Sequence, residues 1–272
     1  MITNIGTCHL ENLGDRDGVL KAKTEIFQSM KPNGHIVLNG DDDKLITVRE
    51  YNGVKPVFFG LNSERDVYAD QIESKGLKGV ACRIHLGEDA FDVLVPTPGI
   101  HMVYNALAAA AVGRIYGLTI EEIRRGIESL ETIRGRFKMI ETDKFLVVDD
   151  CYNANPMSMK ASLDVLHDGE GRRVAILGDM GELGEDEAAL HEGVGIHAAT
   201  CGIDACVCVG DLAVHIAEAA RKANPDFPVY YEKTRESLLE HLNDYVQKGD
   251  TILVKASHFM KFEEVVKALE EM

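Results

Sequence analysis

Three polar turns in the second half of the chain carry the side chains best suited to bind a ligand. They are residues 150–155, 178–184 and 256–258, and each directly follows a short apolar run. Their carboxylates and amides bind hydroxyl and amine groups, and their glycines allow a ligand close to the backbone. Because ligands of parallel sheets bind beyond the carboxyl ends of the strands, we expect the three turns to face one cleft.

The elements that position these turns alternate regularly. Five short apolar runs are typical of buried strands, at 145–149, 174–177, 205–209, 229–231 and 251–254. The stretches after them have helical spacing, near 156–168, 187–199, 211–223, 233–247 and 260–271. This alternation predicts an α/β, Rossmann-like domain, with a doubly wound parallel sheet covered by helices on both faces.

The first half of the chain has a mixed α/β pattern. Residues 36–38 form a short strand that runs into an acidic turn at 39–43, and residues 80–86 and 90–95 flank a turn typical of a β-hairpin. An alanine-rich helix is expected at 102–116, and a second helix begins at Thr119. We place the domain boundary between residues 133 and 134, which gives domains of 1–133 and 134–272.

Composition excludes several classes of protein. The chain has 272 residues and a net charge of -16, which argues against a nucleic-acid or membrane-surface binder because both partners are anionic. No apolar run approaches the roughly 20 residues that span a bilayer, and no signal-peptide pattern opens the chain. The six irregularly spaced cysteines fit reduced thiols in a cytoplasmic protein. Cys206 and Cys208 read as part of a buried strand rather than as a metal site.

His9 and Lys23 could take part in metal chemistry, although either alone reads as an ordinary surface residue. A neutral lysine adds carbon dioxide to give a carbamate, which requires a pKa lowered by burial or by nearby cations. The two carbamate oxygens suit magnesium, and a histidine nitrogen could complete the metal's shell. The residues by themselves do not establish this chemistry.

Several segments resemble the Mur ligases of bacterial cell-wall synthesis, and the resemblance runs through almost the whole chain. In the first half these are Asn4-Ile5-Gly6 with His9-Leu10, Ala22-Lys23 with Ile26-Phe27, Leu38-Asn39 with Asp41-Asp42, and Gly99, His101 and Asn105 with the alanine run 108–111. Gly135-Arg136 resembles the family's domain junction. The segments 149–156 and 178–184 resemble the branch of the family that adds D-alanyl-D-alanine.

The resemblance implies a three-domain parent, with a UDP-sugar domain, a central ATP-binding domain and a Rossmann-like C-terminal domain. This chain corresponds to the C-terminal portion of the central domain, 1–133, and to the whole last domain, 134–272. It contains no G-x-x-x-x-G-K-[ST] phosphate loop. We therefore expect most of an enzyme rather than a whole one, inactive by itself, with a missing or separate N-terminal part.

The implied reaction is ATP-dependent amide bond formation. ATP phosphorylates the terminal carboxylate of a UDP-N-acetylmuramoyl-tripeptide, and the amine of D-alanyl-D-alanine attacks the acyl phosphate. The resemblance implies that His9 and Lys23, as a carbamate, hold Mg2+, and that Arg136 meets the phosphates of ATP. It further implies that Asp150 accepts hydrogen bonds from the ribose and that three residues lie near the adenine end, namely Asn39, His101 and Asn105.

The acceptor dipeptide is expected at the cleft-side turns. The candidate residues there are Asn153, Asn155, Asp179, Glu182, Lys255 and Ser257. Plainer roles remain open for several of the candidates. Arg136 also fits an ordinary hinge cation, and Glu182 a solvated acidic loop. Asp150 also fits a helix cap, although Asn153 or Asn155 is better placed for that role. His191, on the next helix, is expected to be a structural histidine.

Three positions depart from the family pattern, and they bear on nucleotide and acceptor binding. Met102 stands where an asparagine is usual, and Ala256 and His258 stand where glycine and arginine are usual. A non-catalytic nucleotide- or dipeptide-binding module is one alternative, and a related Mur ligase or folylpolyglutamate synthetase is another. A dinucleotide-dependent oxidoreductase is disfavoured, because no G-x-G-x-x-G follows a predicted strand.

Overall fold

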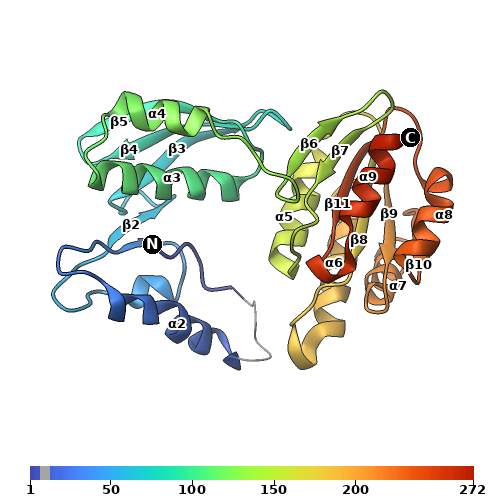
Figure 1. Ribbon diagram of the computed structural model, residues 1–272, viewed down its shortest axis with the longest axis horizontal. Helices are drawn as coiled ribbons and strands as arrows, with labels where there is room; N and C mark the ends of the chain where they lie inside the picture. The colour runs from blue at the N-terminus through green and yellow to red at the C-terminus, as the bar shows by residue number, and fades with distance from the viewer. Residues whose placement is uncertain (7–12) are drawn as a thin grey trace. The chain divides into compact units, whose positions relative to one another are not determined.

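The computed structural model describes residues 1–6 and 13–272 (Figure 1). His9 therefore lies outside the described residues. The chain divides into two compact units, Met1–Glu131 and Thr132–Met272, whereas the sequence suggested a boundary between residues 133 and 134. Each unit contains its own sheet and its own buried core.

The first unit is built on a mixed five-stranded sheet. Its strands are β1 (Val37–Asn39), β2 (Val57–Gly60), β3 (Val67–Ser74), β4 (Val80–Leu86) and β5 (Asp89–Val95), in that spatial order. The first three strands are parallel, and the last three are antiparallel. The hairpin predicted for residues 80–95 is confirmed, and Gly87, with φ of 68°, supplies the left-handed turn between its strands. The sequence patterns did not reveal β2 and β3.

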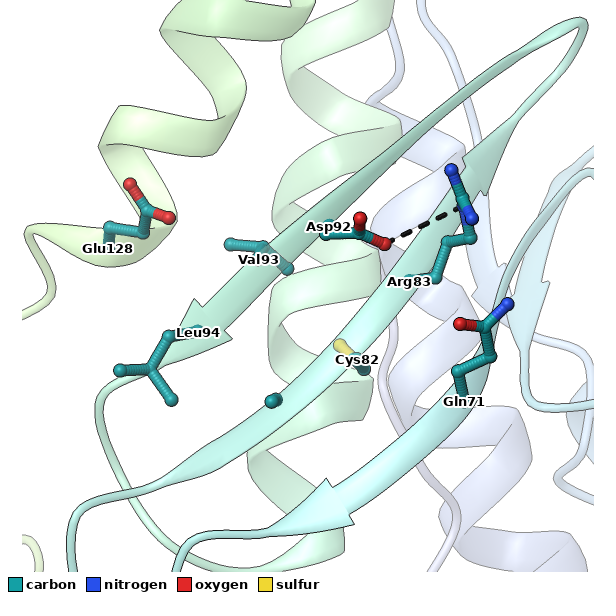
Figure 2. A pocket seen from close by; sticks show the side chains of 8 residues that line it. Gln71, Cys82, Arg83, Asp92, Val93, Leu94 and Glu128 are labelled. Atoms are coloured by element: carbon teal, nitrogen blue, oxygen red, sulfur yellow. Dashed lines mark ion pairs between the residues drawn. The ribbon is translucent and has the colours of Figure 1, made fainter.

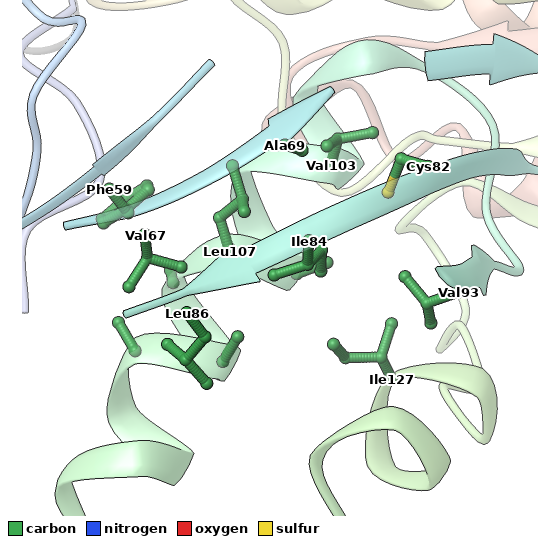
Figure 3. Close-up of a cluster of buried hydrophobic side chains, with 14 of the residues drawn as sticks. Phe59, Val67, Ala69, Cys82, Ile84, Leu86, Val93, Val103, Leu107 and Ile127 are labelled. Carbon is green, nitrogen blue, oxygen red and sulfur yellow. The ribbon is translucent and has the colours of Figure 1, made fainter. Parts of the chain in front are cut away.

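Two helices cover one face of this sheet. Helix α3 (Ile100–Ile115) sends Val103 and Leu107 against Ile84 and neighbouring side chains of β2–β5, as Figure 3 shows. Helix α4 (Ile120–Glu128) adds Ile127 to the same core. Because neighbouring residues of a strand point to opposite faces, Leu38 of β1 faces away from this core. It joins a second apolar cluster with residues of α2 (Arg16–Thr24) and of the short helices Glu25–Ser29 and Leu45–Thr47.

The second unit contains a six-stranded sheet in the order β10-β9-β8-β11-β7-β6. The five strands β7 (Leu146–Asp149), β8 (Arg173–Gly178), β9 (Ala205–Val209), β10 (Val229–Glu232) and β11 (Thr251–Lys255) are parallel. The edge strand β6 (Lys138–Glu141) is antiparallel to β7 and was not predicted. The predicted doubly wound sheet is therefore confirmed, with one added antiparallel strand.

Helices cover both faces of this second sheet. Helices α8 (Arg235–Tyr245) and α9 (Glu263–Glu271) pack on the face that carries Ile252 and Val254. Helices α5 (Pro156–His167), α6 (Glu187–Thr200) and α7 (Ala213–Ala223) pack on the opposite face. Strands β7, β8, β9 and β11 are buried almost throughout, which explains why they read as continuous apolar runs.

Candidate functional site

Strands β8, β11 and β7 are neighbours in the second sheet, so the turns that follow them emerge side by side at its carboxyl edge. These turns are the ones singled out from the sequence, at 150–155, 178–184 and 256–258. Their side chains interact closely with one another and with residues from three helices. The internal contacts of each candidate side chain determine whether it still has hydrogen-bonding groups available for a ligand.

Asp150 and Lys255 bind each other. Lys255 is only 2% exposed, and its ammonium donates to Asp150 Oδ2 at 2.5 Å and to the backbone oxygen of Asn153 at 3.1 Å. Oδ2 also accepts from the Ser162 hydroxyl at 2.7 Å, and Oδ1 accepts from the amide of Phe137 at 3.1 Å. A carboxylate accepts about four hydrogen bonds, so Asp150 retains capacity for one further donor. Lys255 acts here as the partner that fixes Asp150.

The two asparagines of the first turn differ in role. Asn155 caps α5: its side chain accepts from the amide of Ser158, whose hydroxyl accepts from the amide of Asn155. Helix capping, left open above for Asp150, therefore belongs to Asn155. Asn153 is exposed, and its side-chain oxygen accepts from the amide of Ala154. Glu182 is exposed in the second turn and has a left-handed φ of 60°.

Asp179 caps the start of helix α7 (Ala213–Ala223), although it lies more than 30 residues earlier in the sequence. Its carboxylate accepts from the backbone amides of Asp211, Leu212 and Ala213 at 3.1, 3.1 and 2.7 Å, at the start of α7. Gly210 makes the approach possible, because a Cβ there would lie 2.3 Å from the carboxylate. Burial raises the pKa of Asp179 above its ordinary value, while these backbone hydrogen bonds lower it. These contacts differ from the predicted role in placing the dipeptide.

Ser257 joins the three turns. Its amide donates to the backbone oxygen of Asp179 at 3.0 Å, and its hydroxyl accepts from the amide of Gly181 at 2.9 Å. The same hydroxyl donates to the backbone oxygen of Ala154 at 3.5 Å. Phe259, which is exposed, lies over Gly181, where a Cβ would come within 2.9 Å of its ring. The three turns are therefore hydrogen-bonded to one another, and we call residues 150–155, 178–184 and 256–260 together the loop ridge.

Arg136 lies against this ridge. Its guanidinium carbon lies 4.1 Å from the centre of the Tyr152 ring, which supports a cation–π contact. On another side, the Tyr152 ring meets the ring of His258 edge-on, with 5.5 Å between centroids. Tyr152 is absent from the residues predicted above. The signal that could have revealed it is a large aromatic residue inside a polar ligand-facing turn.

The backbone around Arg136 is constrained. Gly135 has φ of 77°, and Phe137 has φ of 53°, which is uncommon for a residue with a side chain. Gly135 accepts from the amide of Tyr152 at 3.0 Å and donates to Asp149 Oδ2 at 2.8 Å. Within the described residues no carboxylate pairs with Arg136. The constrained backbone thus orients Arg136, the Tyr152 ring contacts its guanidinium, and no carboxylate among the described residues neutralises it.

The remaining candidates lie in the first unit. Asn39 is tied into the turn after β1, where its side-chain oxygen accepts from the amide of Asp41 at 2.9 Å. Asn105 is exposed on α3, and together with Met102 it lines an apolar groove of about 420 Å³ between α3 and α4. His101 lies in the first turn of α3.

Lys23 is exposed near the end of α2. Its ammonium donates to the backbone oxygen of Asn4 at 2.9 Å and lies 3.4 Å from the side-chain oxygen of Asn4. A carbamate would keep one N–H, so a contact with Asn4 is compatible with carbamylation. Among residues 1–6 and 13–272, no three His, Cys, Asp or Glu side chains are grouped so as to hold a metal ion.

A second hollow lies on the sheet of the first unit (Figure 2). Its lining includes Gln71, Leu94 and Glu128, and the ion pair between Arg83 and Asp92 spans 3.6 Å across it. No residue predicted to act in the site lies there. None of the helices in the described part of the chain combines the length and the apolar composition needed to cross a bilayer.

Comparison with known proteins identifies the two units as ligase domains. The family model of the Mur ligase middle domain matches residues 1–113, and the model described as Mur ligase, glutamate ligase domain matches residues 135–258. The chain therefore belongs to the Mur ligase family, and the suspected resemblance is confirmed.

Individual relatives point to one branch of the family. The chain is 35% identical over 274 residues to the UDP-N-acetylmuramoyl-tripeptide–D-alanyl-D-alanine ligase of Bacillus subtilis, covering 100% of this chain and 59% of that protein. The crystal structure of MurF from Acinetobacter baumannii has a TM-score of 0.88 and 31% identity, covering 100% of this chain and 60% of that one. The MurF ligase of Thermotoga maritima in complex with ADP has a TM-score of 0.83 and 26% identity, covering 99% of this chain and 61% of the other. The chain thus spans about 60% of the length of these relatives.

Proposed function

We propose that this chain forms part of an ATP-dependent ligase that joins D-alanyl-D-alanine to UDP-N-acetylmuramoyl-tripeptide in peptidoglycan synthesis. The observation that carries the proposal is 35% identity along the whole chain to a ligase of that name. Both substrates and ATP are cytoplasmic metabolites, so the protein acts in the cytoplasm. The reaction passes through an acyl phosphate, and the tripeptide carboxylate is activated before the dipeptide amine attacks.

Arg136 is the residue we assign to the phosphates of ATP. Its guanidinium is held over Tyr152 without a carboxylate partner among the described residues, and a planar guanidinium matches phosphate oxygens in a bidentate way. Asp150, with one acceptor position left, is assigned to a ribose hydroxyl. The adenine end is assigned to Asn39, His101 and Asn105, with Met102 removing one polar contact. The ADP complex of the Thermotoga relative supports nucleotide binding.

Magnesium is assigned to His9 and to Lys23 as its carbamate. Lys23 is exposed, so burial does not favour its carbamate, which would depend on a nearby cation such as the metal itself. Its contact with Asn4 is compatible with the change. Bound there, the metal would supply charge that neutralises the phosphoryl oxygens. The residues of this chain would hold it through one imidazole nitrogen and hard oxygens, the ligand types that suit it.

The acceptor dipeptide is assigned to the loop ridge. Asn153 and Glu182 are exposed there and can meet its amine and amide groups. Asn155, Asp179, Lys255 and Ser257 support the ridge through the hydrogen bonds described above rather than by reaching a ligand. His258, exposed beside Tyr152, stands where arginine is usual in the family.

A chimera tests this function. It places the first part of the Bacillus relative before this chain, and phosphate release is measured with ATP, the UDP-tripeptide and D-alanyl-D-alanine. Arg136→Ala should lower kcat/KM by about 100-fold, because a phosphate-facing cation is lost. Arg134→Ala is the matched control, since Arg134 pairs with Glu270 on the surface and should leave the rate nearly unchanged.

Two results would contradict the proposal. Phosphate release that is equally fast without the dipeptide would show that the reaction is not ligation to it, and faster release with a single amino acid would point to another ligase of the family. Equal losses in Arg134→Ala and Arg136→Ala would remove Arg136 from the phosphate site.

A binding module without catalysis is the second candidate, and the self-contained loop ridge favours it, because the ridge is assembled entirely within Thr132–Met272. Calorimetric titration of the 272-residue chain separates the two. Heat with D-alanyl-D-alanine but none with Mg-ATP would favour the module.

A further inference from the structure

His191 lies completely buried on α6, with both ring nitrogens engaged. Its Nε2 lies 2.9 Å from the backbone nitrogen of Met180, in the turn that follows β8. Its Nδ1 lies 2.7 Å from the backbone oxygen of Glu187, one turn earlier in the same helix. The imidazole thus connects the turn after β8, which is part of the loop ridge, to helix α6 on one face of the sheet.

These two partners require one protonation state. A backbone N–H only donates, so Nε2 must carry the lone pair that accepts from Met180. A backbone oxygen only accepts, so Nδ1 must carry the proton that goes to Glu187. The ring is therefore neutral, with its proton on Nδ1. A second proton would set Nε2–H against Met180 N–H and break the connection.

We propose that His191 is a positioning residue for the loop ridge, and that it holds the segment 179–182 in place only while its ring is neutral. The inference concerns the ridge to which the proposed function assigns the acceptor. Its test reads the position of the loop itself, so it stands or falls separately from the assigned substrate. Next to Met180 lies Gly181, whose amide donates to Ser257, so release of Met180 would also loosen the link to β11.

The surroundings favour the neutral ring. Burial is the largest influence and lowers the pKa of His191 below its ordinary 6.5, and His215 on α7 acts in the same direction. The backbone oxygen of Glu187 and the carboxylates of Asp179 and Glu187 act against it. Above pH 6.5 the connection is complete. It is lost as the pH falls through the lowered pKa of the folded chain.

The direct test is a pH titration of the 15N-labelled 272-residue chain by nuclear magnetic resonance. Ring nitrogen shifts report the protonation of His191, and amide shifts report Met180 and Gly181. We expect the Nδ1–H tautomer at neutral pH, with the Met180 amide moving at the same midpoint as the ring. That midpoint should lie below 6.5, the ordinary value for a histidine.

Two substitutions separate positioning from packing. The side-chain oxygen of His191→Gln reaches the place of Nε2 and can accept from Met180, whereas the oxygen of His191→Asn reaches only the place of Nδ1. Amide exchange at Met180 and Gly181 should be about ten-fold faster in His191→Asn than in wild type and largely restored in His191→Gln. His197→Gln, the control, should leave both amides unchanged.

Three outcomes would overturn the proposal. One is a charged His191 ring at neutral pH, and another is a Met180 amide that does not follow the ring. The third is equal exchange rates in the asparagine and glutamine variants. The first two need only the wild-type chain, so a poorly folding variant does not remove the test.

Discussion

The Lys255 ammonium and the Asp150 carboxylate face each other where little water reaches. Removing one member of a buried pair leaves the other charge without compensation. Asp150 would keep two hydrogen bonds, from Ser162 and Phe137, so the loss is moderated. We expect Lys255→Met to lower the free energy of unfolding by about 2–3 kcal/mol, measured by urea denaturation.

The matched control for Lys255 is a lysine on the surface. Lys267 pairs with Glu271 across one turn of α9, and both side chains are largely exposed. Lys267→Met should change the free energy of unfolding by less than about 0.5 kcal/mol. If the two lysine variants are equally stable, the pair between Lys255 and Asp150 does not contribute as its burial implies.

A second prediction for a single residue concerns Asp179. Asp179→Ala would leave three amides at the start of α7 without their acceptor, and its side chain lies only 7% exposed. The expected loss of stability is about 3 kcal/mol, because an unpaired buried donor costs more than the hydrogen bond itself contributes. Asp179→Asn keeps one oxygen and should lose about half as much.

Urea denaturation measures both Asp179 variants against Asp211→Ala. Asp211 begins the same turn of chain, but its carboxylate is exposed and lies 4.0 Å from Lys233. This variant should change stability by less than about 0.5 kcal/mol. A stable Asp179→Ala protein with weakened dipeptide binding would instead restore the role first predicted from the sequence.

The sequence could not reveal the hydrogen-bond partners of Asp179 and Asp150. Asp179 ends an apolar run, which correctly places it at the carboxyl edge of the sheet. Its acceptor role depends on Ala213, which lies 34 residues later and is brought close by the strand order. The same limit applies to Asp150 and Lys255, which are 105 residues apart. Spacing along a chain indicates which edge a residue occupies, but the neighbours at that edge follow from the topology.

At the scale of elements, one carboxylate connects β10 to α8. Glu232 accepts from Ser237, from Tyr245 at 2.5 Å and from Nδ1 of His241 at 2.9 Å. Burial would raise the pKa of Glu232, but these hydrogen bonds outweigh it and hold the pKa below the ordinary 4.5. The stability from this connection is complete above pH 4.5 and is lost as the pH falls through the lowered pKa.

Glu232→Gln tests this connection. At neutral pH the variant should be about 1–2 kcal/mol less stable, because charge-assisted hydrogen bonds are replaced by neutral ones. The difference should shrink as the pH falls below 4.5, since the wild-type carboxylate then also becomes neutral. Denaturation at several pH values measures it, with the exposed Glu240→Gln as control. A difference that is constant with pH would contradict the account.

The elements themselves were predictable in proportion to their burial. The parallel strands β7, β8, β9 and β11 are buried almost throughout, and they were found together with the less buried edge strand β10. Strand β6 has alternating half-buried and exposed residues over only four positions, and β3 is mostly exposed beyond its start. Helix α2 buries only Val19 among its residues, so its pattern is weak. Elements that bury few side chains show only a weak hydrophobic periodicity in the sequence, so they are hard to predict from it.

At the scale of the whole molecule, the two units have separate cores. We therefore expect residues 132–272 to fold alone and to unfold in one cooperative thermal transition. A domain is independently stable when it has its own core and its backbone polar groups are hydrogen-bonded. The complete chain should show two transitions in calorimetry. Lys255→Met should lower the midpoint temperature of only one of these transitions, the one that residues 132–272 also show when measured alone. A shorter chain that stays unfolded would show that the units depend on each other.

The hydrogen bonds of Ser257 have a practical consequence for redesign of the loop ridge, to which we assign the acceptor dipeptide. Each turn of the loop ridge takes part of its shape from the other two, through the amide and hydroxyl of this serine. Grafting a single turn from a relative with a different acceptor would leave unmatched donors and acceptors at the graft. A successful transplant must therefore exchange all three turns together.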